Sequence, residues 1–70
     1  MTEMSLSVYQ KQIDDLLQND KFDEVITHCR YILKAYPKNV RAYRQLGQAL
    51  FATAQWDEAA EVFQQLLGVS

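Results

Sequence analysis

Apolar side chains recur along the chain every three or four residues, a spacing that places them on one face of an α-helix. Four such stripes follow one another, and no segment shows the alternation of apolar and polar residues that marks a β-strand. The pattern predicts helices at residues 6–19, 22–36, 40–53 and 56–67. Short connections make consecutive helices antiparallel neighbours, so we expect an all-α fold built from two helical hairpins.

Residues that start or stop helices lie between the stripes. Asp20 is expected to cap the second helix and Asn39 the third, because both side chains accept hydrogen bonds from free backbone N–H groups. Pro37 is expected to end the second helix, since proline has no N–H to donate and disfavours helical geometry in the residue before it. Gly68 is expected to end the fourth helix in the usual C′ position.

The chain repeats itself with a period of 34 residues. Shifting the sequence by 34 positions gives five identities, which fall on apolar positions or on one Asp-Glu pair that follows an aromatic residue: Tyr9/Tyr43, Leu16/Leu50, Asp23/Asp57, Glu24/Glu58 and Leu33/Leu67. A fixed period of this length is typical of solenoid proteins. We therefore divide the chain into a leader (1–5), a first repeat (6–39) and a second repeat (40–70).

The letters of the second repeat match a known pattern. The runs are Tyr43-x-x-Leu46-Gly47-x-x-Leu50 and Trp56-Asp57-Glu58-Ala59-x-x-x-Phe63. They resemble the tetratricopeptide repeat, with its W-x₂-L-G-x₂-Y…A-x₃-F…P pattern. The first repeat departs from it, with Gln12-Ile13 in place of Leu-Gly and with Val25 and Cys29 in place of Ala and Phe. The resemblance implies two antiparallel hairpins stacked as a short right-handed superhelix.

Residue size at the helix crossings indicates how each hairpin packs. Gly47 and Ala59 are small where the two helices of the second hairpin approach closely, and Trp56 and Phe63 fill the volume around that contact. The corresponding residues of the first hairpin are larger. We therefore expect that hairpin to be splayed or differently packed, as terminal repeats often are.

The length of the chain raises the question of what stabilises it. Seventy residues, 49% of them hydrophobic and 23% charged, suit a single globular domain. Domains this small usually need a disulfide, a metal or a second copy, and one cysteine cannot form an internal disulfide. We expect either a homodimer through the uncapped fourth helix, at Phe63, Leu66 and Leu67, or a unit of a longer protein that continues into further repeats.

Charge is arranged in three blocks. Residues 1–24 carry a net charge of −4, residues 25–44 of +5 and residues 45–70 of −3. The acidic ends either attract the basic middle, within one chain or between two copies, or all these charges simply face solvent. The net charge of −2 lacks the strong basic bias of nucleic-acid-binding proteins, so we expect no nucleic-acid partner.

No arrangement of residues predicts catalysis, a metal or a cofactor. His28 and Cys29 are adjacent and therefore point about 100° apart on a helix, and Cys29 falls on an apolar stripe, where a buried inert thiol is expected. No glycine-rich loop is present to bind phosphate, and the acidic pairs 14–15 and 23–24 suit caps and surface better than a metal site. We expect no enzymatic activity.

Targeting features are also absent from the sequence pattern. No apolar run reaches the 18 or more residues of a membrane span, and the first 20 residues lack the basic start and apolar stretch of a secretory signal. A single cysteine fits a reducing compartment. These observations predict a cytoplasmic protein that does not associate with membranes.

The resemblance also implies a function, which is to bind protein or peptide segments on the concave face lined by the first helix of each hairpin. Helical phase places eight residues outward on that face: Ser7, Gln10, Asp14 and Leu17 in the first repeat, and Arg41, Arg44, Gln48 and Phe51 in the second. Arg44 and Gln48, one turn apart, would hold a carboxylate or a backbone amide, and Phe51 would add apolar contact.

Three alternatives limit that interpretation. The arginines are solvated surface residues in the simplest reading of the sequence, and Gln10 and Asp14 argue against the chaperone C-terminal carboxylates that some members of the family bind. A second alternative is a structural unit whose role is its own oligomerisation. A third is a regulatory domain of a larger enzyme.

Overall fold

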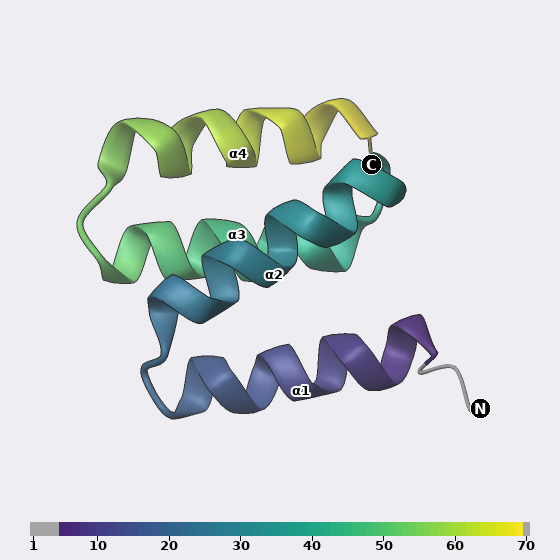
Figure 1. Ribbon diagram of the computed structural model, residues 1–70. Helices are drawn as coiled ribbons and strands as arrows, with labels where there is room; N and C mark the ends of the chain where they lie inside the picture. The colour runs from purple at the N-terminus through teal and green to yellow at the C-terminus, as the bar shows by residue number, and fades with distance from the viewer. Residues whose placement is uncertain (1–4, 70) are drawn as a thin grey trace.

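The computed structural model describes residues 5–69, which form four helices joined by short loops (Figure 1). They are α1 (Leu6–Gln18), α2 (Phe22–Ala35), α3 (Val40–Ala52) and α4 (Trp56–Val69). No strand occurs among these residues. The expected all-α fold of helical hairpins is confirmed, whereas the leader expected at 1–5 lies, apart from Ser5, outside the described residues.

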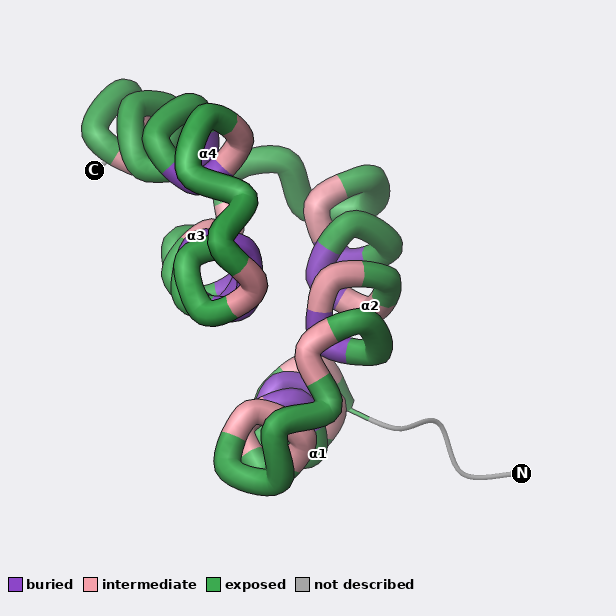
Figure 2. Tube along the Cα trace, turned by 90° about the vertical axis from the view of Figure 1, so that its left-hand side faces the viewer, coloured by how far each residue is buried: buried purple, intermediate pink, exposed green. Residues whose placement is uncertain are grey.

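The two hairpins differ in how tightly they close. α3 and α4 run antiparallel and pack along their length, and α2 packs almost as extensively on α3. α1 contacts both α2 and α3, but much less extensively, and α2 diverges from it after their shared loop (Figures 1 and 2). The splayed first hairpin expected from its larger crossing residues is therefore present.

The hydrophobic core lies where α2, α3 and α4 meet and extends to α1 through one residue. Ten apolar side chains are buried there: Ile13, Val25, Cys29, Ile32, Ala42, Leu46, Ala49, Leu50, Ala59 and Val62. α1 contributes only Ile13 to this set, and its other buried residue is Gln10. The first helix is therefore held to the core by one fully buried apolar side chain, by partly buried ones such as Leu16 and Leu17, and by polar contacts.

Gly47 allows the close approach of α3 and α4. A Cβ atom added at this glycine would lie 2.6 Å from Cζ of Phe63, nearer than real Cβ atoms come to other atoms. The Phe63 ring therefore packs directly on the backbone of α3, and Ala59 is buried beside it. Trp56, expected to fill the same contact, is instead 56% exposed and packs edge-on against Phe51.

Asn39 and Ser5 cap the helices that follow them. The Asn39 side chain accepts a hydrogen bond from the Ala42 backbone N–H, as expected, and Ser5 accepts one from Val8 N–H. α2 ends at Ala35, and the residue before Pro37 has left helical geometry, with φ −131° and ψ 75° at Tyr36. The expected effects of Asn39 and Pro37 are confirmed.

The loops between the helices of each hairpin correct one expectation. Asp20 does not cap α2, because it has a left-handed backbone with φ 59°, and the N-cap is Lys21, whose side chain makes no capping bond. Ala54, at the equivalent position of the second repeat, has φ 61°. In each loop a backbone N–H donates to a carbonyl near the end of the preceding helix: Lys21 N–H to Leu16 O, and Gln55 N–H to Leu50 O.

Gly68 does not end α4. The helix continues through this glycine to Val69, and no glycine in the described residues has a positive φ. Gly68 meets no atom within 4 Å of an added Cβ, so neither a turn nor a close approach requires glycine there. The expected C′ role is therefore wrong.

Ion pairs link the basic middle of the chain to both acidic blocks. Arg41 pairs with Asp14 and Arg30 with Glu58, each at 2.6 Å between nitrogen and oxygen. Attraction within one chain thus accounts for part of the block pattern. All four side chains are about half exposed, so each pair contributes about 0.2–1 kcal/mol.

Candidate functional site

A polar cluster joins α1 to α3 on the side of the molecule that these two helices share. The Gln45 amide is buried and donates to Asp14 Oδ1 at 2.7 Å and to the Gln10 backbone carbonyl at 2.9 Å. Arg41 donates to the other carboxylate oxygen of Asp14 at 2.6 Å. Gln10, also buried, donates to Asn39 Oδ1 at 2.7 Å. The cluster fixes the position of α1 relative to α3.

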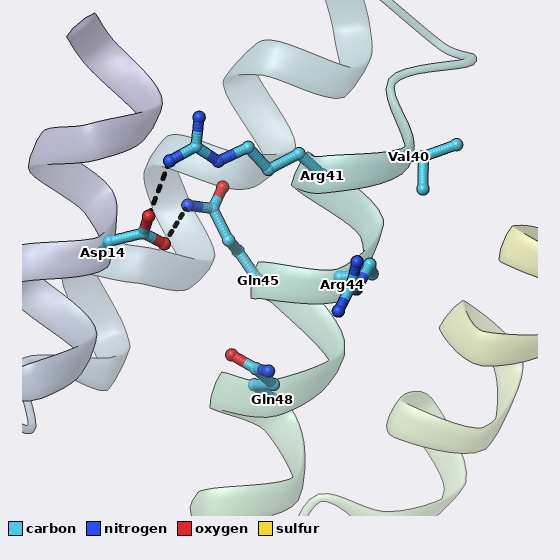
Figure 3. A pocket seen from close by; sticks show the side chains of 6 residues that line it. All are labelled: Asp14, Val40, Arg41, Arg44, Gln45 and Gln48. Carbon is cyan, nitrogen blue, oxygen red and sulfur yellow. Dashed lines mark hydrogen bonds and ion pairs between the residues drawn. The ribbon is translucent and has the colours of Figure 1, made fainter. Parts of the chain in front are cut away.

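This cluster forms one wall of a hollow of about 480 Å³ between the two helices. The hollow is lined by six residues, drawn in Figure 3: Asp14, Val40, Arg41, Arg44, Gln45 and Gln48. Figure 3 draws no interaction from Arg44 or Gln48 to the other lining residues, and their side chains make no hydrogen bond or ion pair within residues 5–69. Two guanidinium groups and one carboxylate give the lining a net positive charge.

The structure places the eight residues predicted for this face in three kinds of environment. Arg44, Gln48, Arg41 and Asp14 line the hollow together. Ser7 and Phe51 are exposed but lie outside it, and Phe51 packs against Trp56 at the far end of α3. Gln10 and Leu17 do not point outward as expected: Gln10 is 4% exposed within the α1–α3 cluster, and Leu17 is half-buried against the core.

The sequence pattern did not identify Gln45 as part of the site. Gln45 sits on α3 one residue before the Leu-Gly pair, and its side chain is 3% exposed, although glutamine is rarely buried. The double role of Asn39, which caps α3 and accepts from Gln10, was missed as well. Every buried side-chain nitrogen and oxygen in the described residues has a hydrogen-bond partner.

Asp14 is ionised more readily than an ordinary aspartate. Burial raises the pKa of its carboxyl group, but the hydrogen bonds from Gln45 and Arg41 and the charge of Arg41 lower it by more, so the net shift is downward. Because the side chain is 42% exposed, water weakens these interactions. The carboxylate carries a negative charge at neutral pH, and its two oxygens already accept hydrogen bonds from Arg41 and Gln45.

A lowered pKa in the folded state makes stability depend on pH in a defined direction. The carboxylate stabilises the fold above the unfolded-state pKa of about 3.9, and this contribution is lost as pH falls through the lower folded-state pKa. We expect Asp14→Asn to lose less of its free energy of unfolding than the parent chain between about pH 7 and pH 2.5. Urea titrations at both pH values measure this loss, with Asp15→Asn, exposed and one residue away, as control. An equal loss in parent and D14N would contradict the assignment.

Cys29 and His28 do not form a reactive pair. The Cys29 thiol is fully buried, and burial, with a smaller contribution from the Asp14 charge, raises its pKa to about 12. His28 turns toward α1 instead, where its Nδ1 lies 2.6 Å from the Tyr9 hydroxyl oxygen. A protonated, buried thiol is a poor nucleophile, so the expected inert role of Cys29 fits the structure.

The described part of the chain has neither a metal-ligand cluster nor a membrane-spanning helix. Among residues 5–69, no three His, Cys, Asp or Glu side chains gather as metal ligands would. None of the helices there has the length and apolar character needed to cross a bilayer.

The motif, the period and the helical arrangement agree with a comparison against protein families. The family model described as "Tetratricopeptide repeat" matches residues 16–69, which include all of α2, α3 and α4. The chain belongs to the tetratricopeptide repeat family. Searches of curated proteins and of solved structures gave no match. Tetratricopeptide repeats are interaction modules that typically have no catalytic activity, and the family therefore indicates a protein-binding role.

Proposed function

We propose that the protein binds an extended peptide segment of a partner protein in the hollow between α1 and α3, without catalysing a reaction. The observation that carries the proposal is the pair Arg44 and Gln48, which line the hollow and have no partner among the described residues. Arg41 and Gln45, in contrast, are already bonded to Asp14. A ligand therefore meets two unoccupied polar groups on a wall that the Gln45–Asp14 bond holds in place.

The free groups define the chemistry of the ligand. Arg44 presents a guanidinium group that binds a carboxylate through two parallel hydrogen bonds, and Gln48, one turn later, offers an amide to the peptide backbone. Phe51 follows at the next turn and is 59% exposed. A peptide lying along α3 would thus place a carboxylate at Arg44 and an apolar side chain near Phe51.

Solution binding with defined peptides tests this proposal. The probes are heptapeptides that end in glutamate with a free C-terminus, and the same peptides ending in glutamine with an amidated C-terminus. We expect the acidic set to shift the backbone amide resonances of α3 at Arg44 and Gln48. Arg44→Ala should weaken binding by about tenfold or more, as expected for a charge-assisted bidentate contact.

The matched control is Lys34→Ala, which also removes one exposed positive charge but lies on α2, outside the hollow. An equal loss of affinity in R44A and K34A would show that only net charge matters. Equal binding of the acidic and amidated peptides would also contradict the proposed contact.

The remaining expectations about function and place stay predictions. We expect no nucleic-acid partner, because the net charge is −2, and a cytoplasmic location, because the chain has a single cysteine. Homo-oligomerisation, the alternative function, needs a different surface from the α1–α3 hollow. That surface is on α4.

A further inference from the structure

α4 exposes an apolar stripe that the hollow between α1 and α3 does not include. Trp56, Ala60, Phe63 and Leu67 follow one another at intervals of four, three and four residues, which is the spacing of a helix–helix seam. Trp56, Phe63 and Leu67 are 56%, 37% and 77% exposed. Phe51 of α3 widens the stripe, since its ring packs edge-on against Trp56 at 4.8 Å between centroids.

The internal repeat indicates what such a stripe does. The equivalent residues of α2, 34 positions earlier, are Phe22, Ile26, Cys29 and Leu33. Cys29 is fully buried, with its thiol 4.0 Å from Gln45 Oε1 of α3, the other three pack against the core, and α2 packs more extensively on α3 than on α1. The α4 stripe therefore occupies the positions that, in the first repeat, receive another helix.

The first helix of a second copy is a poor cover for this stripe. α3 has six buried residues, and the α1 equivalents of Gly47 and Leu50 are buried or half-buried. The other four, Ala42, Gln45, Leu46 and Ala49, have as their α1 equivalents Val8, Lys11, Gln12 and Asp15, all of which are exposed. Stacking copies head to tail, as the repeats stack within the chain, would bury one lysine, one glutamine and one aspartate against apolar side chains. Burial of charged groups against apolar side chains is strongly unfavourable, so this open arrangement is disfavoured.

We propose that the stripe binds the same stripe of a second copy, with the two α4 helices antiparallel. In this register Trp56 faces Leu67 of the second copy, and Ala60 faces Phe63 of the second copy, so each large ring meets a smaller side chain. A parallel pair would set Phe63 against Phe63 and would place the acidic residues Asp57, Glu58 and Glu61 beside their own copies. The antiparallel pair avoids both the steric clash between the two Phe63 rings and the repulsion between the acidic side chains.

The size of the stripe predicts a weak dimer. An aromatic side chain offers roughly 150–250 Å², so the exposed parts of Phe51, Trp56, Phe63 and Leu67 present roughly 400 Å² of apolar surface on each copy. With the residues that flank the stripe, two copies bury close to the roughly 1,000 Å² that a specific interface needs. We expect a dissociation constant on the order of 10–100 μM for an interface at this lower limit.

Sedimentation equilibrium of the 70-residue chain between about 5 μM and 1 mM covers this range. We expect the mass to rise from 8.1 kDa toward twice that value as concentration increases. Ala60→Lys should raise the dissociation constant at least tenfold, while Ala52→Lys, the same change at an exposed residue of α3 outside the stripe, should leave it unaltered. Circular dichroism of A60K checks that the fold is kept.

Mixing two cysteine variants tests the orientation. We expect Trp56→Cys mixed with Leu67→Cys to form the mixed disulfide in preference to either homodimeric disulfide. A chain that is monomeric at every concentration, an A60K variant that still dimerises, or preferential homodimeric disulfides would overturn the proposal. The two proposed surfaces share Phe51, but Ala60 belongs only to the stripe and Arg44 only to the hollow. A60K should therefore still bind the acidic heptapeptides and R44A should still dimerise, so either proposal can fail alone.

Discussion

Replacing Leu50 by alanine should remove a large part of the free energy of unfolding of this chain. Leu50 is fully buried on α3 and belongs to the hydrophobic core that α3 forms with the other helices. Truncating a buried leucine costs about 2–5 kcal/mol, because apolar surface is lost and a cavity remains. A 70-residue domain has a total stability of only about 4–10 kcal/mol at ordinary values per residue. We expect a decrease of about 10–30 °C in melting temperature, measured by circular dichroism.

The matched control is the same substitution at Leu67, which is 77% exposed on α4. At a few micromolar, below the concentrations at which the chain is proposed to dimerise, Leu67→Ala should change stability by less than about 0.5 kcal/mol. Equal destabilisation by L50A and L67A would mean that the core does not lie where α2, α3 and α4 meet. A small effect of L50A alone would mean that neighbouring side chains collapse into the cavity.

The helices were predictable because their physical causes are local. Apolar residues at intervals of three and four define one face of each helix, and Pro37 and Asn39 act on the backbone within a few residues of their own position. How closely the two helices of each hairpin pack was predictable for a similar reason. Gly47 is small at its crossing and Ile13 is not, and residue size alone limits how near two helix backbones come.

The hairpin loops were not predictable in the same way. Residues with positive φ are usually glycine, and here Asp20 and Ala54 occupy those positions instead. Asp20 is also a common N-cap residue, so the sequence offered a local reason for the wrong assignment. The loop hydrogen bonds run from one backbone group to another, and backbone groups leave no signature in residue type.

The candidate site shows the limit of helical phase as evidence. Helical phase places Gln10 and Gln48 on the predicted concave face, but Gln10 is buried against α3 and Gln48 is exposed. Which side chain is covered depends on the neighbouring helix, and this depends on the crossing of α1 and α3. Arg44 and Gln48 are exposed and line the hollow, whereas their role in binding stays a prediction.

Gln45→Leu is the second substitution for which we expect a large effect. The amide of this buried glutamine donates to Asp14 Oδ1 and to the Gln10 carbonyl, and leucine of similar size leaves both acceptors without these donors. Losing a hydrogen bond to a charged group such as the Asp14 carboxylate costs about 1.5–3 kcal/mol. Because Ile13 is the only buried apolar residue of α1, the loss should appear mainly as local opening of that helix.

Hydrogen exchange followed residue by residue separates local opening from global unfolding. We expect amides of α1 to exchange about 10–100-fold faster in Q45L, while amides of α3 and α4 change less, because each factor of ten corresponds to about 1.4 kcal/mol. Gln48→Leu is the control: it makes the same change one turn later on α3, at an exposed side chain with no hydrogen bond in the described residues. Its exchange rates should match those of the parent chain. If Q45L and Q48L accelerate exchange equally in α1, the Gln45 cluster does not hold this helix, and Ile13 together with the contact to α2 must do so.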